Sequence, residues 1–151
     1  MNKIQKEILL KDLCARFPYK VKIDRELVDP TTGSHGHEIA ILDTSDIDVI
    51  TTSIGLGDEG NCVDGTMKGF VFCGERDENF VDGYMCKPYL RPMSSMTKDE
   101  WNEYENYILN EKDASIKFCN SLNFYGRHHI DYRGMIDMDL ALVAPDDMYE
   151  F

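Results

Sequence analysis

The sixteen residues CKPYLRPMSSMTKDEW, numbers 86–101, separate strand-like sequence from helical sequence. Pro88 and Pro92 are predicted to stop the sheet, because proline has a fixed φ and no N–H to donate to a neighbouring strand. The residues that follow Pro92 have the composition of a helix start. The stretch therefore predicts a β-rich part before it and a helical part after it.

The first helix of the helical part is predicted to begin at Thr97. Thr97 and Glu100 have the spacing of a capping box, in which each side chain accepts a hydrogen bond from the backbone N–H of the other residue. Met96 and Trp101 stand at the two positions of a hydrophobic staple. The apolar stripe of this helix is expected to contain Trp101, Tyr104 and Ile108.

A second helix is predicted to begin at Asp113, which is a favoured N-cap residue, and to end at Gly126 in the left-handed conformation. Residues 140–143 are predicted to form a last short strand. The side chains of the second helix that are expected to point inward are Ile116, Cys119 and Leu122.

The sequence before residue 86 begins with a predicted amphipathic helix over residues 2–17, which ends at Phe17-Pro18. Residues 19–24 then alternate between apolar and polar, as a half-exposed strand does. Four further strands are predicted at residues 38–43, 47–54, 66–73 and 80–87. The apolar face of the first helix is expected to contain Ile4, Ile8, Leu9 and Leu13.

These elements predict one α+β domain over residues 1–151, with a β-rich part at about 19–87 and a helical part at about 97–126. The expected order is an N-terminal helix, an antiparallel β-meander or small partly closed barrel, two C-terminal helices and a short return. No long helix separates the predicted strands, so a parallel arrangement is not expected.

The net charge of −12 is distributed unevenly along the chain. Residues 26–86 hold thirteen acidic and two basic residues. Such a surface repels nucleic acid and favours either solubility or a basic protein partner. The five cysteines are odd in number and contain no CxxC pair, and no apolar run approaches the length of a membrane helix. We therefore expect a cytoplasmic protein in which most cysteines are small buried apolar residues.

Two stretches, KPYLRPMSSMTKDEW (residues 87–101) and HHIDYRGMIDMDLAL (residues 128–142), carry a resemblance to known sequences. They resemble the signature stretches of a family of small uncharacterised proteins encoded by gut anaerobic bacteria and their phages. The resemblance implies a phage-related origin, but no reaction, ligand or catalytic residue. The chain has Asp137-Met138-Asp139 where a Glu-Lys-Gly turn is common in the family, which leaves the turn geometry open at that point.

The four histidines form two close pairs, His35 with His37 and His128 with His129, and Asp131 follows the second pair. Residues at i and i+2 of an extended segment share a face, so each pair could reach one ion. If the pairs converged, their imidazoles and one carboxylate would suit zinc or another divalent transition metal, and a metal-bound water could be activated for hydrolysis.

Three other sequence patterns resemble binding sites but are interpreted as parts of the fold or of its surface. Residues 55–60 read GLGDEG, which matches a dinucleotide fingerprint in letters only, because no helix follows to receive the phosphates. The cluster Asp43, Asp46 and Asp48 is interpreted as a solvated strand edge. A charged outer face is expected for the N-terminal basic set, which could otherwise touch nucleic-acid phosphates and consists of Lys3, Lys6, Lys11, Arg16, Lys20, Lys22 and Arg25.

We expect a non-enzymatic role as a small acidic interaction protein that binds a basic host protein. The alternatives are a metal-dependent hydrolase that uses the histidine pairs and a nucleic-acid binder that uses the basic N-terminus. No resident cofactor is expected apart from the metal of the first alternative. Several tyrosines could be exposed anchors of an interface, namely Tyr84, Tyr89, Tyr104, Tyr107, Tyr125, Tyr132 and Tyr149.

Overall fold

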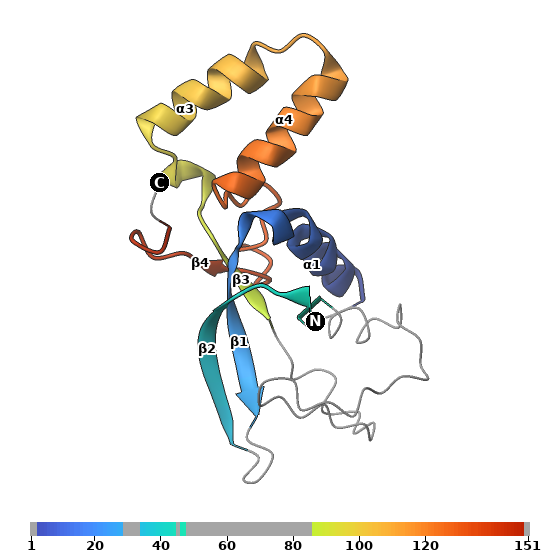
Figure 1. Ribbon diagram of the computed structural model, residues 1–151, viewed down its shortest axis with the longest axis vertical. Helices are drawn as coiled ribbons and strands as arrows, with labels where there is room; N and C mark the ends of the chain where they lie inside the picture. The colour runs from blue at the N-terminus through green and yellow to red at the C-terminus, as the bar shows by residue number, and fades with distance from the viewer. Residues whose placement is uncertain (1–2, 29–33, 45, 48–85, 150–151) are drawn as a thin grey trace. The chain divides into compact units, whose positions relative to one another are not determined.

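The computed structural model describes residues 3–28, 34–44, 46–47 and 86–149. Its elements confirm the α+β class, with an N-terminal helix, a sheet and two C-terminal helices (Figure 1). The chain divides into two compact units, Met1–Pro88 and Tyr89–Phe151. The expectation of a single domain stays a prediction.

The N-terminal helix of the first unit is α1 (Lys3–Arg16), which confirms the helix predicted over residues 2–17. A short 3₁₀ turn, η1 (Phe17–Tyr19), follows it. The buried face of α1 differs from the predicted one, because Ile4 is 70% exposed. The residues of α1 that are buried recur at helical spacing and are Leu9, Asp12, Leu13 and Arg16. Asp12 and Arg16 can be buried there because they form an ion pair, with Nε 2.6 Å from Oδ2.

Strands β1 (Lys22–Val28) and β2 (His35–Ile41) form an antiparallel ladder, in register from Lys22 opposite Ile41 to Val28 opposite His35. They correspond to the strands predicted around residues 19–24 and 38–43. The strands predicted at 47–54 and 66–73 lie outside the described residues, apart from Ile47. The predicted strand 80–87 also lies outside them as far as residue 85.

Strand β3 (Lys87–Leu90) corrects the prediction that Pro88 stops the sheet. Pro88 lies inside the strand, opposite Ile23 of β1. The ladder between β1 and β3 spans only two residue pairs, and the fixed φ of proline suits an extended backbone there. The second half of β3 pairs in parallel with β4 (Leu142–Val143).

The strand order is β2-β1-β3-β4. The ladders on both sides of β1 are antiparallel, and the ladder between β3 and β4 is parallel. Among the described residues the sheet is therefore open and mixed, rather than the expected antiparallel meander or partly closed barrel. The predicted last strand is confirmed as β4, at the end of the expected short return.

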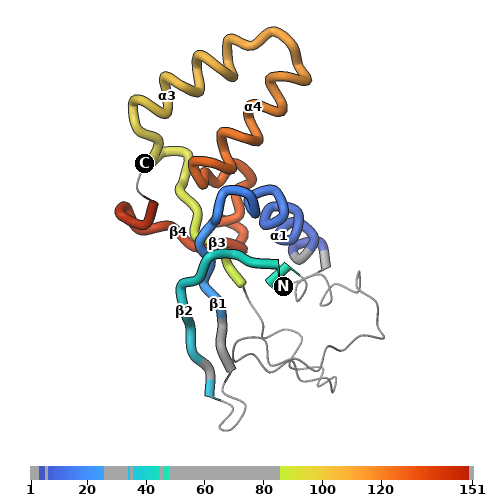
Figure 2. The backbone as a smooth tube through the Cα atoms, in the orientation of Figure 1, coloured from blue at the N-terminus to red at the C-terminus, as the bar shows by residue number. Residues whose placement is uncertain are grey.

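The second unit contains a helical hairpin, shown as a continuous tube in Figure 2. A 3₁₀ turn, η2 (Met93–Ser95), leads into α3 (Lys98–Tyr104), a π-helical turn η3 (Glu105–Leu109) and α4 (Ala114–Arg127). The predicted capping box is confirmed at the start of α3. The N–H of Glu100 donates to Thr97 Oγ1 at 3.2 Å, and the N–H of Thr97 donates to Glu100 Oε2 at 2.7 Å.

The core of the hairpin contains three buried apolar side chains, Ile108, Phe124 and Ile130. Met96, Tyr104 and Tyr125 pack against this core and are partly buried. The predicted cap of the second helix is confirmed, because Asp113 Oδ1 accepts hydrogen bonds from the N–H groups of Ser115 and Ile116. Ile116 and Cys119, however, are exposed and do not point inward as predicted, because α4 turns Phe124 toward the core instead.

The end of α4 also differs from the prediction, since Gly126 lies inside the helix. The left-handed residue is His129, with φ of 54°. The N–H of His129 donates to the carbonyl of Gly126 and the N–H of Ile130 donates to the carbonyl of Tyr125, at 3.2 and 3.0 Å. This is the hydrogen-bond pattern of a Schellman motif, with histidine where glycine is the usual residue.

The turn at residues 137–139 has a left-handed backbone at Asp139, with φ of 59°. The N–H of Leu140 donates to the carbonyl of Met135 at 2.9 Å and closes the turn. Asp adopts this region more readily than most residues, because its short side chain can form local hydrogen bonds. Asp139 therefore serves at a position where glycine would be the least strained residue.

Candidate functional site

The predicted histidine pair of the first unit lies on β2. His35 and His37 occupy alternate positions of β2. His37 is exposed, and its Nδ1 lies 3.0 Å from Oδ2 of Asp24 on the neighbouring strand. This exposed imidazole–carboxylate pair joins β1 to β2.

The second predicted group, His128, His129 and Asp131, lies at the end of α4 in the second unit. The ring of His129 is buried and stacks on Tyr149, with centroids 3.8 Å apart. The Asp131 carboxylate accepts hydrogen bonds from the backbone N–H groups of Met135 and Ile136, at 2.8 and 2.9 Å. His129 and Asp131 are thus engaged in local structure.

No group of three or more His, Cys, Asp and Glu side chains among the residues that the structure describes could hold a metal ion. The two predicted pairs belong to different units. Their convergence into one metal site therefore stays a prediction.

A cluster of charged side chains, here called the hairpin-base cluster, joins the start of α3 to the end of α4. It consists of Arg91, Glu100, Glu103, Arg127 and His128. Arg91 binds Glu100 with two parallel bonds, Nη1 to Oε1 at 2.6 Å and Nη2 to Oε2 at 2.9 Å. Arg91 also donates to the carbonyls of Ser95 and His128. Arg127 pairs with Glu103.

His128 lies between the two glutamates of the hairpin-base cluster. Its Nε2 is 3.2 Å from Glu103 Oε2, and its Nδ1 is 3.0 Å from Glu100 Oε1. The ring also packs against Phe124, with centroids 4.6 Å apart. The imidazole therefore links the two carboxylates of α3 to the core of the hairpin.

Glu100 is the most buried carboxylate of the hairpin-base cluster, with an exposed fraction of 6%. Burial alone would raise its pKa. The hydrogen bonds from Arg91 and from the Thr97 amide, with the charges of Arg91 and His128, act in the opposite direction and lower the pKa of Glu100 to about 2. The capping carboxylate is therefore ionised at neutral pH.

A second cluster lies in the first unit around the buried Arg25. Its Nε and Nη2 donate to the two oxygens of Asp46 at 2.9 and 2.7 Å, and it also reaches Glu38 and Asp43 at 3.2 and 3.4 Å. Burial opposes the charge, but these carboxylates raise the pKa of Arg25 above its ordinary value.

The Arg25 cluster corrects two interpretations of the sequence. Asp46 is only 2% exposed, so it belongs to the interior and not to a solvated strand edge. Asp43 is partly exposed, and Asp48 lies outside the described residues. Arg16 and Arg25 are buried in ion pairs, so these two members of the N-terminal basic set do not lie on a charged outer face.

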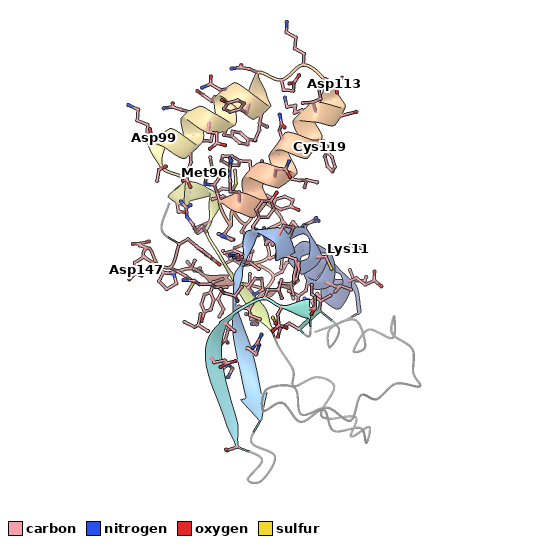
Figure 3. All side chains as sticks on the ribbon, in the orientation of Figure 1. Lys11, Met96, Asp99, Asp113, Cys119 and Asp147 are labelled. Atoms are coloured by element: carbon pink, nitrogen blue, oxygen red, sulfur yellow. The ribbon has the colours of Figure 1, made fainter. Side chains whose placement is uncertain are left out.

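The helical hairpin exposes several large apolar side chains. Trp101 is 45% exposed, although the sequence predicts it in the apolar stripe of the helix and in the hydrophobic staple. Met96, its predicted staple partner, packs against the hairpin core. The other exposed apolar residues of the hairpin are Tyr107, Leu109, Ile116 and Phe118. In Figure 3 the labels of Asp99 and Asp113 mark the start of α3 and the turn into α4.

Aromatic rings continue from Trp101 across the hairpin. The ring centroids of Trp101 and Tyr104 are 5.6 Å apart, and the hydroxyls of Tyr104 and Tyr125 are 3.1 Å apart. Tyr125 stacks on Tyr132, with centroids 4.8 Å apart, and the guanidinium of Arg133 lies over the Tyr132 ring, also at 4.8 Å. Tyr104 and Tyr125 are partly buried, whereas Trp101 is exposed. The role of the tyrosines as interface anchors stays a prediction.

Sequence reasoning missed the apolar stripe of α4 that continues this aromatic run. Phe118, Leu122 and Tyr125 recur at i, i+4 and i+7, which places three side chains on one side of a helix. Phe118 is 64% exposed, whereas Leu122 and Tyr125 are partly buried. The spacing is visible in the sequence, but the set Ile116, Cys119 and Leu122 has helical spacing as well and is the predicted inward side of α4.

The cysteines of the described residues are all free. Cys86 is buried, and burial raises the pKa of its thiol. Cys14 and Cys119 are exposed, which corrects the expectation of burial for these two. Cys62, Cys73 and the GLGDEG stretch at residues 55–60 lie outside the described residues.

Comparison with known proteins returned no relative. No protein-family model, no curated protein and no solved structure matches the chain. Within the described part of the chain, every helix is too short or too polar to cross a membrane.

Proposed function

We propose that the protein is a non-enzymatic accessory protein that binds a basic protein partner through its acidic surface. The observation that carries this proposal is the burial of arginines against carboxylates. Arg16, Arg25 and Arg91 each pair with an acidic side chain in the interior or at its edge. Setting aside those pairs leaves 13 of the 16 basic residues and 25 of the 28 acidic residues. Acidic residues then outnumber basic ones almost two to one.

The second unit illustrates this imbalance. Residues 89–151 contain six basic and twelve acidic residues. Two of the basic residues, Arg91 and Arg127, belong to the hairpin-base cluster. A surface of this kind speeds the encounter with a positively charged partner and disfavours phosphate backbones and anionic lipids. Exposed carboxylates of the unit include Asp99, Glu105, Asp137, Asp146 and Asp147.

The resemblance to proteins of gut bacteria and their phages supports a phage-related role, in which the partner is a bacterial host protein. This part of the proposal rests on residues 87–101 and 128–142 alone. It determines which lysate is the appropriate source of partners.

The proposal is tested by affinity capture with the full chain on a resin, bacterial host lysate and elution in steps of increasing salt. The matched control carries Asp99→Asn, Glu105→Gln, Asp137→Asn, Asp146→Asn and Asp147→Asn, and its circular dichroism must match the wild type. We expect a small set of basic proteins that the wild type retains and the control loses, because charge attraction depends on ionic strength. Equal retention by both proteins, or no retained protein, would contradict the proposal.

A further inference from the structure

The two sides of the helical hairpin differ in chemistry. One side, here called the aromatic face, consists of Trp101, Tyr104, Phe118, Leu122, Tyr125 and Tyr132. The other side, here called the polar face, carries the ion pair of Glu103 with Arg127 and the hydrogen bond from Asn120 to the carbonyl of Tyr107. The hairpin therefore presents two surfaces that would select different partners.

Helix geometry explains this division for α4. At about 100° per residue, Phe118, Leu122 and Tyr125 fall within about 60° of arc. Ile116 lies about 160° around the helix from Phe118, on the side of Asn120 and Arg127. Phe118 and Ile116 are both exposed, at 64% and 51%, so two similar residues of one helix represent the two faces.

The aromatic face has the chemistry to hold a cation. The guanidinium of Arg133 already lies 4.8 Å from the centroid of the Tyr132 ring, at one end of the aromatic run. Trp101, at the other end, is 45% exposed, and indole is the strongest aromatic partner of a cation. The exposed carboxylate of Glu105 lies four residues after Trp101, which places it on the same side of the helix.

The charge of the unit distinguishes between possible occupants of the aromatic face. A second copy of the chain would bring a further excess of acidic residues to the contact, and a nucleic acid would bring phosphates. A partner with arginines around apolar residues matches both the rings and the exposed carboxylate of Glu105. Charge complementarity therefore selects a basic protein segment.

We propose that the aromatic face docks an arginine-bearing, partly apolar segment of the partner protein through cation–π and apolar contacts. The inference rests on the proposed function and deepens it, because it identifies the surface and the side chains that make the contact. Tryptophan, tyrosine and arginine are the residue types that contribute most of the binding energy at protein interfaces. The proposed contact brings arginines of the partner against Trp101 and the tyrosines of the aromatic face.

Trp101 is the only tryptophan of the chain, so its fluorescence reports on the aromatic face directly. The full chain is titrated with a synthetic peptide of leucine and arginine whose leucines recur at helical spacing. A peptide in which glutamate replaces arginine serves as the negative probe. Calorimetry of the same mixtures measures binding at any surface. We expect saturable binding of the arginine peptide with a change in Trp101 emission, and neither effect with the glutamate peptide.

The variants Phe118→Ala and Ile116→Ala form the matched pair. We expect Phe118→Ala to weaken binding by about tenfold or more and Ile116→Ala by less than about twofold. Both side chains are exposed, so both variants are expected to fold, which circular dichroism verifies.

The outcomes separate the inference from the proposed function. Calorimetric binding with equal affinity in the two variants, or with unchanged Trp101 emission, would overturn the aromatic face as the docking site and leave the basic partner in place. No calorimetric binding of the arginine peptide would count against both. A change of Trp101 emission with protein concentration alone would assign the face to a second copy and overturn the inference.

Discussion

Arg25 in the first unit and Arg91 in the second unit are both held by carboxylates, but in different balances of charge. Arg25 faces three acidic side chains, Asp46, Glu38 and Asp43. The hairpin-base cluster around Arg91 contains two arginines, two glutamates and a histidine. In the first cluster one arginine contacts three carboxylates, whereas in the second cluster two arginines and a histidine contact two carboxylates.

The largest effect is expected from Arg25→Met, which removes the guanidinium that pairs with the buried Asp46 carboxylate. Breaking a buried ion pair from one side costs about 3–5 kcal/mol of unfolding free energy. Urea denaturation followed by far-UV circular dichroism measures the loss. The control is Lys11→Met on the exposed side of α1, with an expected change within about 0.5 kcal/mol. A loss below about 1 kcal/mol for Arg25→Met would contradict a stabilising role for the Arg25–Asp46 ion pair.

Arg91→Met is expected to cost less, about 2–3 kcal/mol, because Glu100 keeps His128 and the Thr97 amide as neighbours. Trp101 fluorescence during urea denaturation follows this unit, since the chain has one tryptophan. A loss of unfolding free energy equal to that of Arg25→Met would show that His128 and the Thr97 amide do not compensate Glu100 for the missing arginine.

Acid is expected to weaken the second unit through Glu100. Its folded pKa of about 2 lies below the ordinary pKa of 4.5 for a glutamate, so the carboxylate contributes stability that is present above pH 4.5 and is lost as the pH falls toward 2. We expect this contribution to be about 2 kcal/mol, given the solvent at the edge of the cluster. Denaturation of wild type and Glu100→Gln at several pH values tests it. Parallel pH profiles for the two proteins would exclude Glu100 as the source.

Thr97→Ala is expected to cost about 1 kcal/mol, because the first turn of α3 loses the side chain that accepts from the Glu100 N–H. Thermal denaturation followed by Trp101 fluorescence detects a change of this size. Ser94→Ala, in the preceding 3₁₀ turn, is the control and should leave the midpoint nearly unchanged.

The smallest effect is expected from His37→Ala, within about 0.5 kcal/mol, since His37 and its partner Asp24 form an exposed pair. The same variant tests the metal-dependent alternative. That alternative requires stoichiometric metal in untagged protein and weaker metal affinity in His37→Ala and His129→Ala, as measured by elemental analysis and metal titration.

Features set by short stretches of sequence were predictable. The capping box at Thr97 and Glu100 and the cap at Asp113 each involve residues within three positions of one another, so the letters alone identify them. The ion pair of Arg25 with Asp46 joins residues 21 positions apart. Such a partner is determined by strand pairing and burial, which spacing does not reveal.

The errors at Pro88 and Gly126 have the same origin. Local preference predicts that proline ends a strand and that glycine ends a helix. In the structure, strand pairing extends the sheet through Pro88, and stacking on Tyr149 accompanies the left-handed backbone of His129. The exposure of Trp101 at the candidate site could not be predicted for the same reason. Helical periodicity shows which residues share a side of a helix, but not which side a second helix will cover.

The π-helical turn η3 gives the hairpin a particular tolerance of length. A π-turn holds one residue more than the α-helical turn that it replaces, as though a single residue had been inserted without breaking the helix. Removing one residue between Glu105 and Leu109 would therefore convert η3 into a regular α-helical turn and leave the preceding helix α3 unchanged. Ile108 lies within η3 and belongs to the hairpin core, so the π-helical turn also sets the position of a core side chain.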